Sequence, residues 1–187
     1  MQAQYTQTSI RDLLGHTLIF GATAAGCSTD LYPDLEGRQY VRDGQIINHP
    51  SALARVRDQL PTPTNCRFCC GTIQLVNNSQ FYGGREYGWP FAYACCNCGA
   101  RVGCHPGTDV PLGTLADQAT MNARRAAHAA FDPLWKNKGK GMRTKAYRAL
   151  SKAMGREKAH ISWMDVDECR QVVAAIAAGE IVLDRAY

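Results

Sequence analysis

The stretch that decides the fold is ACCNCGARVGCH, residues 94–105, which holds four cysteines and a histidine in twelve residues. A second group lies upstream in NCRFCCG, residues 65–71, and adds Cys66, Cys69 and Cys70. Cysteine and histidine at this density supply the thiolate and imidazole ligands that zinc prefers in proteins. The two segments therefore predict a metal site, and the spacing within them indicates which side chains share the ion.

Spacing favours two C-x-x-C pairs, Cys66 with Cys69 and Cys95 with Cys98. Two residues between ligands allow one tight turn to present both sulfurs to one ion, and two such turns supply the tetrahedral thiolate set of a structural zinc. Gly99 follows the second pair, where the turn requires a permissive backbone. We therefore expect one structural Zn²⁺ held by these four cysteines in a small zinc-ribbon-like unit.

Other ligand choices stay open at the level of sequence. Cys70 or Cys96 could replace its neighbour in either pair, although the spacing then becomes three residues or one. Cys104 or His105 could supply a fourth ligand in place of one of the four cysteines. A cysteine that binds no metal, such as Cys169 on the apolar face of the last predicted helix, is expected to be a small buried hydrophobic residue.

Residues suited to acid–base catalysis are few. The candidates are His105 with Asp109, in CHPGTD, and His128 with Asp132, four residues apart on one predicted helix. A four-cysteine site has no open position for substrate, and the H-x-E element that precedes P-C-x-x-C in zinc deaminases is absent from the sequence. The sequence therefore assigns no catalytic residue and favours a role other than catalysis.

Three regions are expected along the chain, and together they predict an α+β fold. Residues 1–62 form a short α/β N-terminal region of unassigned role, residues 65–112 the zinc-ribbon-like unit, and residues 113–187 a basic helical region. The proline-rich PTPT, residues 61–64, is a stiff border between the first two. We expect the small antiparallel zinc unit to pack with a three-helix C-terminal part.

Local patterns predict the elements of the first two regions. SIRDLL is predicted as a short helix capped by Ser9, HTLIF as a strand, and Asp43-Gly44 as the turn of a hairpin. HPSALARVRDQL, residues 49–60, is predicted as a helix with Leu53, Val56 and Leu60 on its apolar face. Between the cysteine groups, TIQLVN and FAYAC are predicted as strands of an antiparallel sheet.

Helical periodicity predicts three helices after residue 112, over residues 113–135, 143–155 and 164–179. Gly155 is expected to close the second helix, and Asp165 to cap the third. The last residues, EIVLDRAY, are predicted as a short strand. The apolar face of the first helix is expected to comprise Leu115, Ala119, Ala123, Ala126, Ala127, Ala130, Phe131 and Leu134.

Positive charge is concentrated in one part of the chain. The net charge is +5, but residues 121–160 hold eleven Lys or Arg against two acids, a local net charge of +9. Concentrated positive charge is typical of surfaces that neutralise phosphate groups. The candidate nucleic-acid-binding residues are Lys136, Lys138, Lys140, Arg143, Lys145, Arg148 and Lys152. The aromatic residues expected to stack on bases are Phe81, Tyr82, Tyr87 and Trp89.

Two functional hypotheses follow. The first is a module that binds DNA or RNA mainly through backbone contacts, because the sequence contains no base-reading motif. The second is an interaction protein, phage-encoded, that docks on a host protein complex such as a polymerase or a defence system, since a zinc-stapled scaffold offers a preformed surface at low ordering cost. If these residues have no binding role, the lysines form a solvated helix face and the aromatic side chains fill the small core.

Several longer motifs carry a resemblance to a known group: CRFC, YGGREYG, CCNCGARVGCHPGTDVPLGTLAD, RRAAHAAFDPLWK, RTKAYRALSKAMG and AHISWMDVDECRQVV. Over residues 66–178 the chain resembles zinc-finger-containing proteins of bacteria and their phages, a family without an assigned activity. The resemblance implies a zinc-ribbon-like unit joined to a helical part. In that group the first pair reads C-P-x-C-G, so Arg67 stands at the proline position and Cys70 at the glycine position.

Composition indicates where such a protein resides. No apolar run approaches the roughly 18 residues needed to cross a membrane, and the first residues lack the basic and apolar segments of a signal peptide. Nine cysteines in a reducing compartment favour metal binding over disulfides. We expect a cytoplasmic protein of a bacterial host cell, with no membrane partner.

Overall fold

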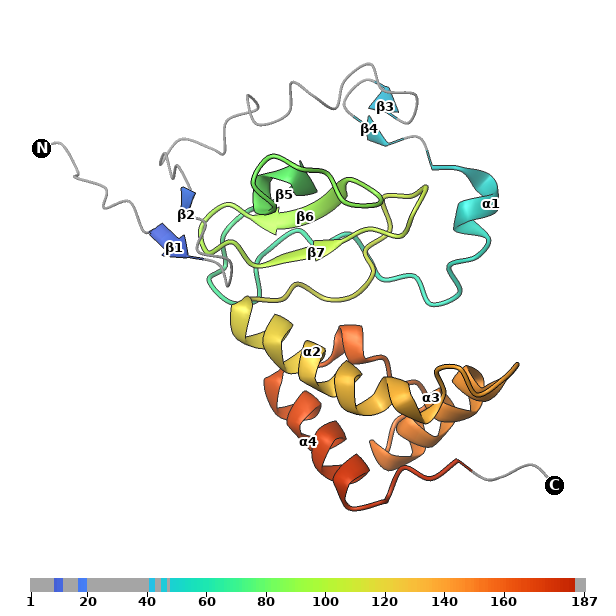
Figure 1. The fold of residues 1–187 in the computed structure, drawn as a ribbon. Helices are drawn as coiled ribbons and strands as arrows, with labels where there is room; N and C mark the ends of the chain where they lie inside the picture. Colours follow the sequence, from blue (N-terminus) through green and yellow to red (C-terminus); the bar gives the residue numbers. More distant parts are fainter. Residues whose placement is uncertain (1–8, 12–16, 20–40, 43–44, 47, 184–187) are drawn as a thin grey trace, which may run out of the picture. The chain divides into compact units, whose positions relative to one another are not determined.

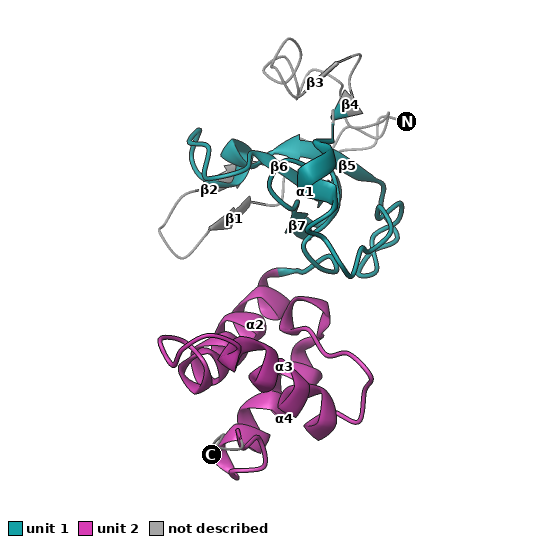
Figure 2. Ribbon diagram, turned by 90° about the vertical axis from the view of Figure 1, so that its right-hand side faces the viewer, with its two compact units in different colours: residues 1–117 teal, residues 118–187 magenta. Residues whose placement is uncertain are grey.

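The chain forms two compact units, residues 1–117 and 118–187, in the computed structural model (Figure 2). Within the described residues the fold is α+β, as predicted, with a three-stranded antiparallel sheet in the first unit and helices in the second. The structure describes residues 9–11, 17–19, 41–42, 45–46 and 48–183.

Two short antiparallel strand pairs lie in the N-terminal part of the first unit (Figure 1). Strand β1 (Ser9–Arg11) pairs with β2 (Thr17–Ile19), and β3 (Val41–Arg42) pairs with β4 (Gln45–Ile46). The predicted strand and hairpin are confirmed there, although the turn residues 43–44 lie outside the described part. The predicted helix from Ser9 is wrong, because residues 9–11 form a strand instead. A six-residue helix is only marginally stable in water, whereas pairing with β2 satisfies the backbone hydrogen-bonding groups.

Helix α1 (Pro50–Leu53) is a single turn, shorter than the predicted helix over residues 49–60. It begins after His49, with Pro50 at its first position. The next two backbone bonds, from Arg55 to the Ala52 carbonyl and from Val56 to the Leu53 carbonyl, span three residues and end the helix in tight turns. Ala52 is the buried residue of α1. The predicted apolar residues Leu53, Val56 and Leu60 are half-buried, but only Leu53 lies within the helix.

The sheet of the first unit has the order β5-β6-β7 and is antiparallel throughout. Its strands are β5 (Ile73–Asn77), β6 (Phe91–Cys95) and β7 (Arg101–Gly103). The first two were predicted and are confirmed, whereas β7 was not predicted. The register places Ile73 opposite Cys95, so the start of β5 and the end of β6 lie beside the two cysteine pairs.

Alternate residues of the central strand β6 pack on opposite faces of the sheet. One face forms a cluster of Phe91 and Tyr93 with Ile46 and Cys104. The other face forms a cluster of Ala92 and Ala94 with Val76 and Phe81. The segment after β7 covers the edge of that strand, since Arg101 and Ala116 exchange two backbone hydrogen bonds of 2.9 and 3.1 Å.

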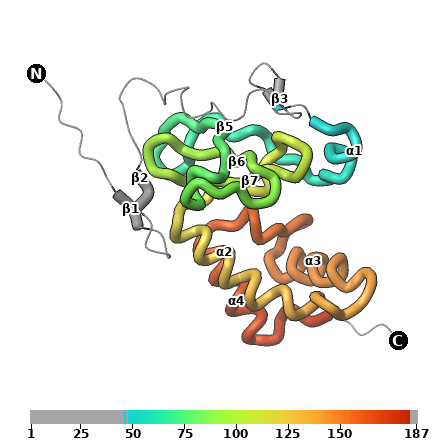
Figure 3. Tube along the Cα trace, turned by 45° about the horizontal axis from the view of Figure 1, so that its top comes forward, coloured from blue at the N-terminus to red at the C-terminus, as the bar shows by residue number. Residues whose placement is uncertain are grey.

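The second unit contains the three predicted helices, α2 (Gln118–Phe131), α3 (Met142–Ala153) and α4 (Val166–Ala177), with α2 and α4 side by side (Figure 3). Short 3-10 turns η3 (Asp132–Leu134) and η4 (Ile161–Trp163) connect them. Buried residues of α2, α3, η4 and α4, together with residues of the segments between and after them, form one core: Ala127, Phe131, Ala146, Leu150, Ala159, Ile161, Met164, Cys169, Val172 and Ile181.

Both predicted caps are present. Asp165 accepts a hydrogen bond from the Glu168 backbone, and the Glu168 side chain accepts one from the Asp165 backbone, which is a complete capping box. Gly155 and Gly179 follow α3 and α4 with positive φ angles of 62° and 73°. Glu180–Leu183 is not a strand in the structure, which corrects the prediction for the described part of that tail.

The predicted apolar face of the first helix needs two corrections. Leu115 precedes α2 and packs in the first unit with Cys66, Cys95 and Ala100. Ala119 and Ala126 are exposed, because the buried side of α2 is set by Thr120, Ala127 and Phe131. Among the described residues, the helices fall short of the length and hydrophobicity that a bilayer span needs.

Candidate metal centre

The sulfurs of Cys66, Cys69, Cys95 and Cys98 all lie within 4.8 Å of one another. The Cys66 and Cys98 sulfurs are 3.5 Å apart, and the Cys69 and Cys95 sulfurs are 3.4 Å apart. Tetrahedral zinc with bonds of about 2.3 Å holds its sulfurs roughly 3.8 Å apart. The four thiols therefore fit one structural zinc ion, and a closed set of this kind leaves no coordination position for substrate.

The two cysteine pairs stand on turns of the same construction. The Cys66 backbone N–H donates to the Gly71 carbonyl over 2.9 Å, and the Cys95 N–H donates to the Ala100 carbonyl over 2.8 Å. Both bonds close a loop of six residues around one C-x-x-C pair. The chain thus builds the site from two matching knuckles, one before β5 and one between β6 and β7.

The residue after each pair has a left-handed backbone. Cys70 has a φ of 58° and Gly99 a φ of 72°. The Cys70 N–H donates to the Cys66 carbonyl over 2.8 Å, and the Gly99 N–H donates to the Cys95 carbonyl over 3.1 Å. The permissive backbone expected at Gly99 is therefore present, and Cys70 adopts the same left-handed conformation without being glycine.

Backbone N–H groups point at the sulfurs from within each knuckle. The Phe68 N–H donates to the Cys66 sulfur and the Asn97 N–H to the Cys95 sulfur, each over 3.4 Å. Such donors stabilise the thiolate form that binds metal. Their presence in both knuckles is a second observation, beside the sulfur distances, that fits these cysteines to a metal ion.

The thiols differ in pKa before a metal is considered. Burial raises the pKa of Cys66, but the Phe68 and Cys69 N–H groups and the neighbouring thiols outweigh it, so the pKa lies below its ordinary value. Burial raises the pKa of Cys95 and of Cys98 above the ordinary value. Zinc binding would release protons from those two thiols, so metal affinity is expected to fall in acid.

The site is continuous with the core of the first unit. Cys66 and Cys95 are buried and pack with Ala100 and Leu115, whereas Cys69 is exposed. The knuckles also touch each other, because the Cys96 N–H donates to the Thr72 carbonyl over 3.1 Å. A zinc ion here would fasten the ends of β5 and β6 together.

The remaining cysteines of the two segments have other surroundings. Cys104 is buried on the Phe91 face of the sheet, where burial and the Asp109 carboxylate raise its pKa to about 12. Cys70 is exposed and Cys96 half-buried. Among the described residues, the group of potential metal ligands comprises the four cysteines named above and includes neither Cys104 nor His105. Cys169 is buried in the helical core, and Cys27 lies outside the described residues.

CHPGTD forms a tight turn that holds the segment before α1. The His105 carbonyl accepts hydrogen bonds from both the backbone and the hydroxyl of Thr108, each over 3.0 Å. The side chains of Asn48 and Asp109 are joined over 2.9 Å, and the Asp109 N–H donates to the Asn48 amide oxygen over 2.8 Å. The His49 N–H donates to the Gly107 carbonyl over 3.0 Å. Asn48 had no sequence signal, because its partners are about 60 residues away.

The other predicted residues divide by exposure. His128, in the last turn of α2, and Asp132, the first residue of η3, lie 3.3 Å apart as a partly exposed pair. Phe81 is 4% exposed with Arg101 above its ring, so its predicted role in base stacking is wrong. Trp89 is partly buried and donates to the Thr108 carbonyl over 2.7 Å. Tyr82 and Tyr87 are exposed, as are all seven predicted basic residues of the second unit.

A family model described as a zinc-finger-containing domain matches residues 62–178. This region includes the four cysteines, the sheet and the three long helices. Comparison with curated proteins and with solved structures found no match to the chain.

Proposed function

Because the chain belongs to the zinc-finger-containing family, with a cysteine cluster that fits one structural zinc, we propose that it binds nucleic acid. The contacts are mainly to the phosphate backbone, made by a basic surface on the second unit. The basic surface consists of Lys136, Lys138, Lys140, Arg143, Lys145, Arg148 and Lys152.

The observation that carries the proposal is that all seven cations are exposed and, among the residues that the structure describes, lack acidic partners. None of them pairs with an Asp or Glu side chain within the described part of the chain. Arg143 lies over the rings of Trp135 and Tyr147, 5.4 Å from each centroid, and so is held toward one side of α3. A surface whose charge is not neutralised internally attracts polyanions and gains free energy from counterion release.

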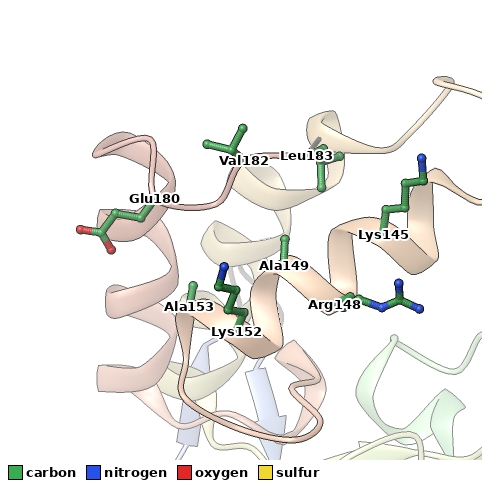
Figure 4. A pocket seen from close by; sticks show the side chains of 8 residues that line it. All are labelled: Lys145, Arg148, Ala149, Lys152, Ala153, Glu180, Val182 and Leu183. Carbon is green, nitrogen blue, oxygen red and sulfur yellow. The ribbon is translucent and has the colours of Figure 1, made fainter. Parts of the chain in front are cut away.

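The helical part of this surface lines a groove. Lys145, Arg148 and Lys152 project from α3 at the rim of a groove of about 570 Å³ (Figure 4). Their spacing along the helix covers about 10 Å at 1.5 Å per residue, which suits contacts with more than one phosphate. The other lining residues are Ala149, Ala153, Glu180, Val182 and Leu183.

The loop before α3 extends the same surface. Its lysines alternate with Asn137, Gly139 and Gly141, which have positive φ angles of 63°, 97° and 83°. A Cβ atom placed on either glycine would meet nothing within 4 Å, so this backbone is open to solvent. Lysines separated by small residues leave room for a bulky sugar–phosphate chain to approach their ammonium groups.

The test is a binding titration with the full-length, zinc-loaded protein. Fluorescence anisotropy with 20-nucleotide single strands and duplexes of DNA and RNA is followed from about 50 to 200 mM salt. The variant Lys145→Glu/Arg148→Glu should bind at least about tenfold more weakly at low salt. Its slope of log K against log salt should become shallower by about 0.7 to 0.9 for each phosphate group that the variant no longer neutralises.

The matched control is Arg55→Glu/Arg57→Glu, which makes the same charge change at two exposed arginines of the first unit. If the two double variants lose equal affinity, net charge alone accounts for binding and the basic surface is not the site. If the wild-type protein binds no nucleic acid at about 50 mM salt, the proposal fails. Affinity purification from the native cell that returns one protein partner regardless of nuclease treatment would then favour docking on a host protein.

A further inference from the structure

The connection between β5 and β6 presents two exposed aromatic rings on the first unit. Tyr82 is 49% exposed and Tyr87 is 57% exposed. Their ring centroids are 5.0 Å apart with an interplanar angle of 74°, an edge-to-face pair. This pair lies outside the basic surface, in a different unit of the chain.

Two buried asparagines hold the connection in place. The Asn78 side chain donates to the carbonyls of Tyr87 and Trp89 over 2.6 and 3.1 Å, and accepts from the Tyr87 N–H over 3.1 Å. The Asn77 side chain accepts from the Ser79 N–H over 2.8 Å and donates to the Glu86 carboxylate. Exposed rings on a backbone that is fixed in this way are preorganised for contact, which lowers the entropic cost of binding.

The surroundings of the pair are open and carry a cation. Gly83, Gly84 and Gly88 have positive φ angles, and a Cβ atom on any of them would meet nothing within 4 Å. Arg85 is exposed between the two tyrosines in sequence. A flat ligand can therefore approach the rings over bare backbone, on a connection that also carries the Arg85 guanidinium and the Glu86 carboxylate.

We infer that Tyr82 and Tyr87 form a stacking site for unpaired bases, so that single-stranded nucleic acid is the preferred partner. This inference rests on the proposed function and narrows it. Bases within a duplex are stacked on one another and cannot reach a side chain, whereas those of a single strand can stack on aromatic rings.

The experiment uses the full-length zinc-loaded protein and three probes: a 12-nucleotide single strand, the same strand with abasic central positions, and its duplex. The abasic strand keeps every phosphate and removes only the bases, so it isolates stacking from charge. The wild-type protein should bind the intact strand between about 5-fold and about 150-fold more tightly than the abasic strand. Duplex should bind more weakly than the intact strand.

Variants at the pair complete the test. Tyr82→Ala/Tyr87→Ala should bind intact and abasic strands equally, whereas Tyr82→Phe/Tyr87→Phe keeps both rings and should retain the preference for the intact strand. Zinc content and thermal unfolding of each variant identify any loss of fold, and the abasic comparison on the wild-type protein needs no variant.

The outcomes separate this inference from the proposed function. Equal, salt-dependent binding of intact and abasic strands by the wild-type protein overturns stacking and leaves the basic surface standing. An intact-strand preference that survives in the alanine variant overturns the assignment to these tyrosines. Absence of binding to all three probes overturns both proposals, and a protein partner then becomes the better occupant of this surface.

Discussion

Cys70 and Gly99 occupy equivalent positions in the two knuckles, each directly after a ligand pair and each with a left-handed backbone. For an L-residue other than glycine this conformation costs roughly 1–2 kcal/mol. Cys70 is held in it by the hydrogen bond to the Cys66 carbonyl, although its own side chain is exposed and outside the sulfur cluster. An unligated thiol thus stands beside two thiols that fit a metal.

Alkylation should distinguish the two kinds of thiol. With iodoacetamide on the folded, zinc-loaded protein, we expect Cys70 to react first among the described cysteines, because it is exposed and not bound. Cys69 is also exposed and should be protected until a chelator removes the metal. Peptide mass mapping with and without chelator measures both, and rapid alkylation of Cys69 in the zinc-loaded protein would remove it from the ligand set.

Metal analysis should find about one zinc per chain. Cys95→Ser removes a buried ligand and should abolish stoichiometric zinc, whereas Cys70→Ser, the neighbouring control, should retain it. Chelation should unfold the first unit and preserve most helical circular dichroism, because the core of the second unit contains none of the four cysteines. Retention of zinc by Cys95→Ser would indicate another ligand in its place.

Gly107 should tolerate a side chain poorly. Its φ is 81°, and a Cβ atom there would lie 2.9 Å from the Cβ of Ala52. Gly107→Ala therefore combines left-handed strain with a clash and is expected to lower the free energy of unfolding by about 2–4 kcal/mol. Gly83→Ala is the matched control, since its φ of 62° brings strain without a clash, and it should lose only about 1–2 kcal/mol. Chemical denaturation measures the free energy of unfolding of both variants. Equal losses would show that the contact with Ala52 does not add to the cost of Gly107→Ala.

The capping box of α4 makes a separate stability prediction. Asp165→Ala removes the acceptor for the Glu168 N–H and should destabilise the second unit by about 0.5–2 kcal/mol. Asp167→Ala, two residues on, removes only an exposed ion pair with Arg170 and should change stability by less than about 0.5 kcal/mol. Thermal unfolding of both variants measures the two losses of stability, and a larger loss for Asp167→Ala would contradict the capping role of Asp165.

His105 should contribute to acid sensitivity. Burial lowers the pKa of its imidazole, so the unfolded chain binds the proton more readily than the folded one. Stability from this residue is therefore complete above the unfolded pKa of about 6.5 and is lost as pH falls. The stability difference between wild type and His105→Gln should shrink from pH 7.5 to pH 5.5 in urea titrations, and a difference independent of pH would show that His105 does not titrate differently on folding.

Features that depend on neighbours in sequence were predictable. The spacing of the cysteines indicated the sulfur cluster, and Asp165 and Gly155 marked helix ends because caps act within one turn. Strand β7 was missed because its three residues become a strand only through pairing with β6. Phe81 and Tyr82 are adjacent aromatics with opposite exposure, which only the packing of the sheet decides. The partnership of Asn48 with Asp109 is equally beyond local patterns.

The tie between Asn48 and the CHPGTD turn bears on how the protein should be cut for experiments. A fragment trimmed to the matched region, residues 62–178, would discard Asn48 and the buried side chains of Ile46, Ala52 and Ile181. It would expose Phe91 in the first unit and part of the helical core around Leu150 in the second unit. The portion shared with the family is shorter than the portion that packs together, so a fragment bounded by sequence similarity is expected to lose stability for reasons unrelated to zinc.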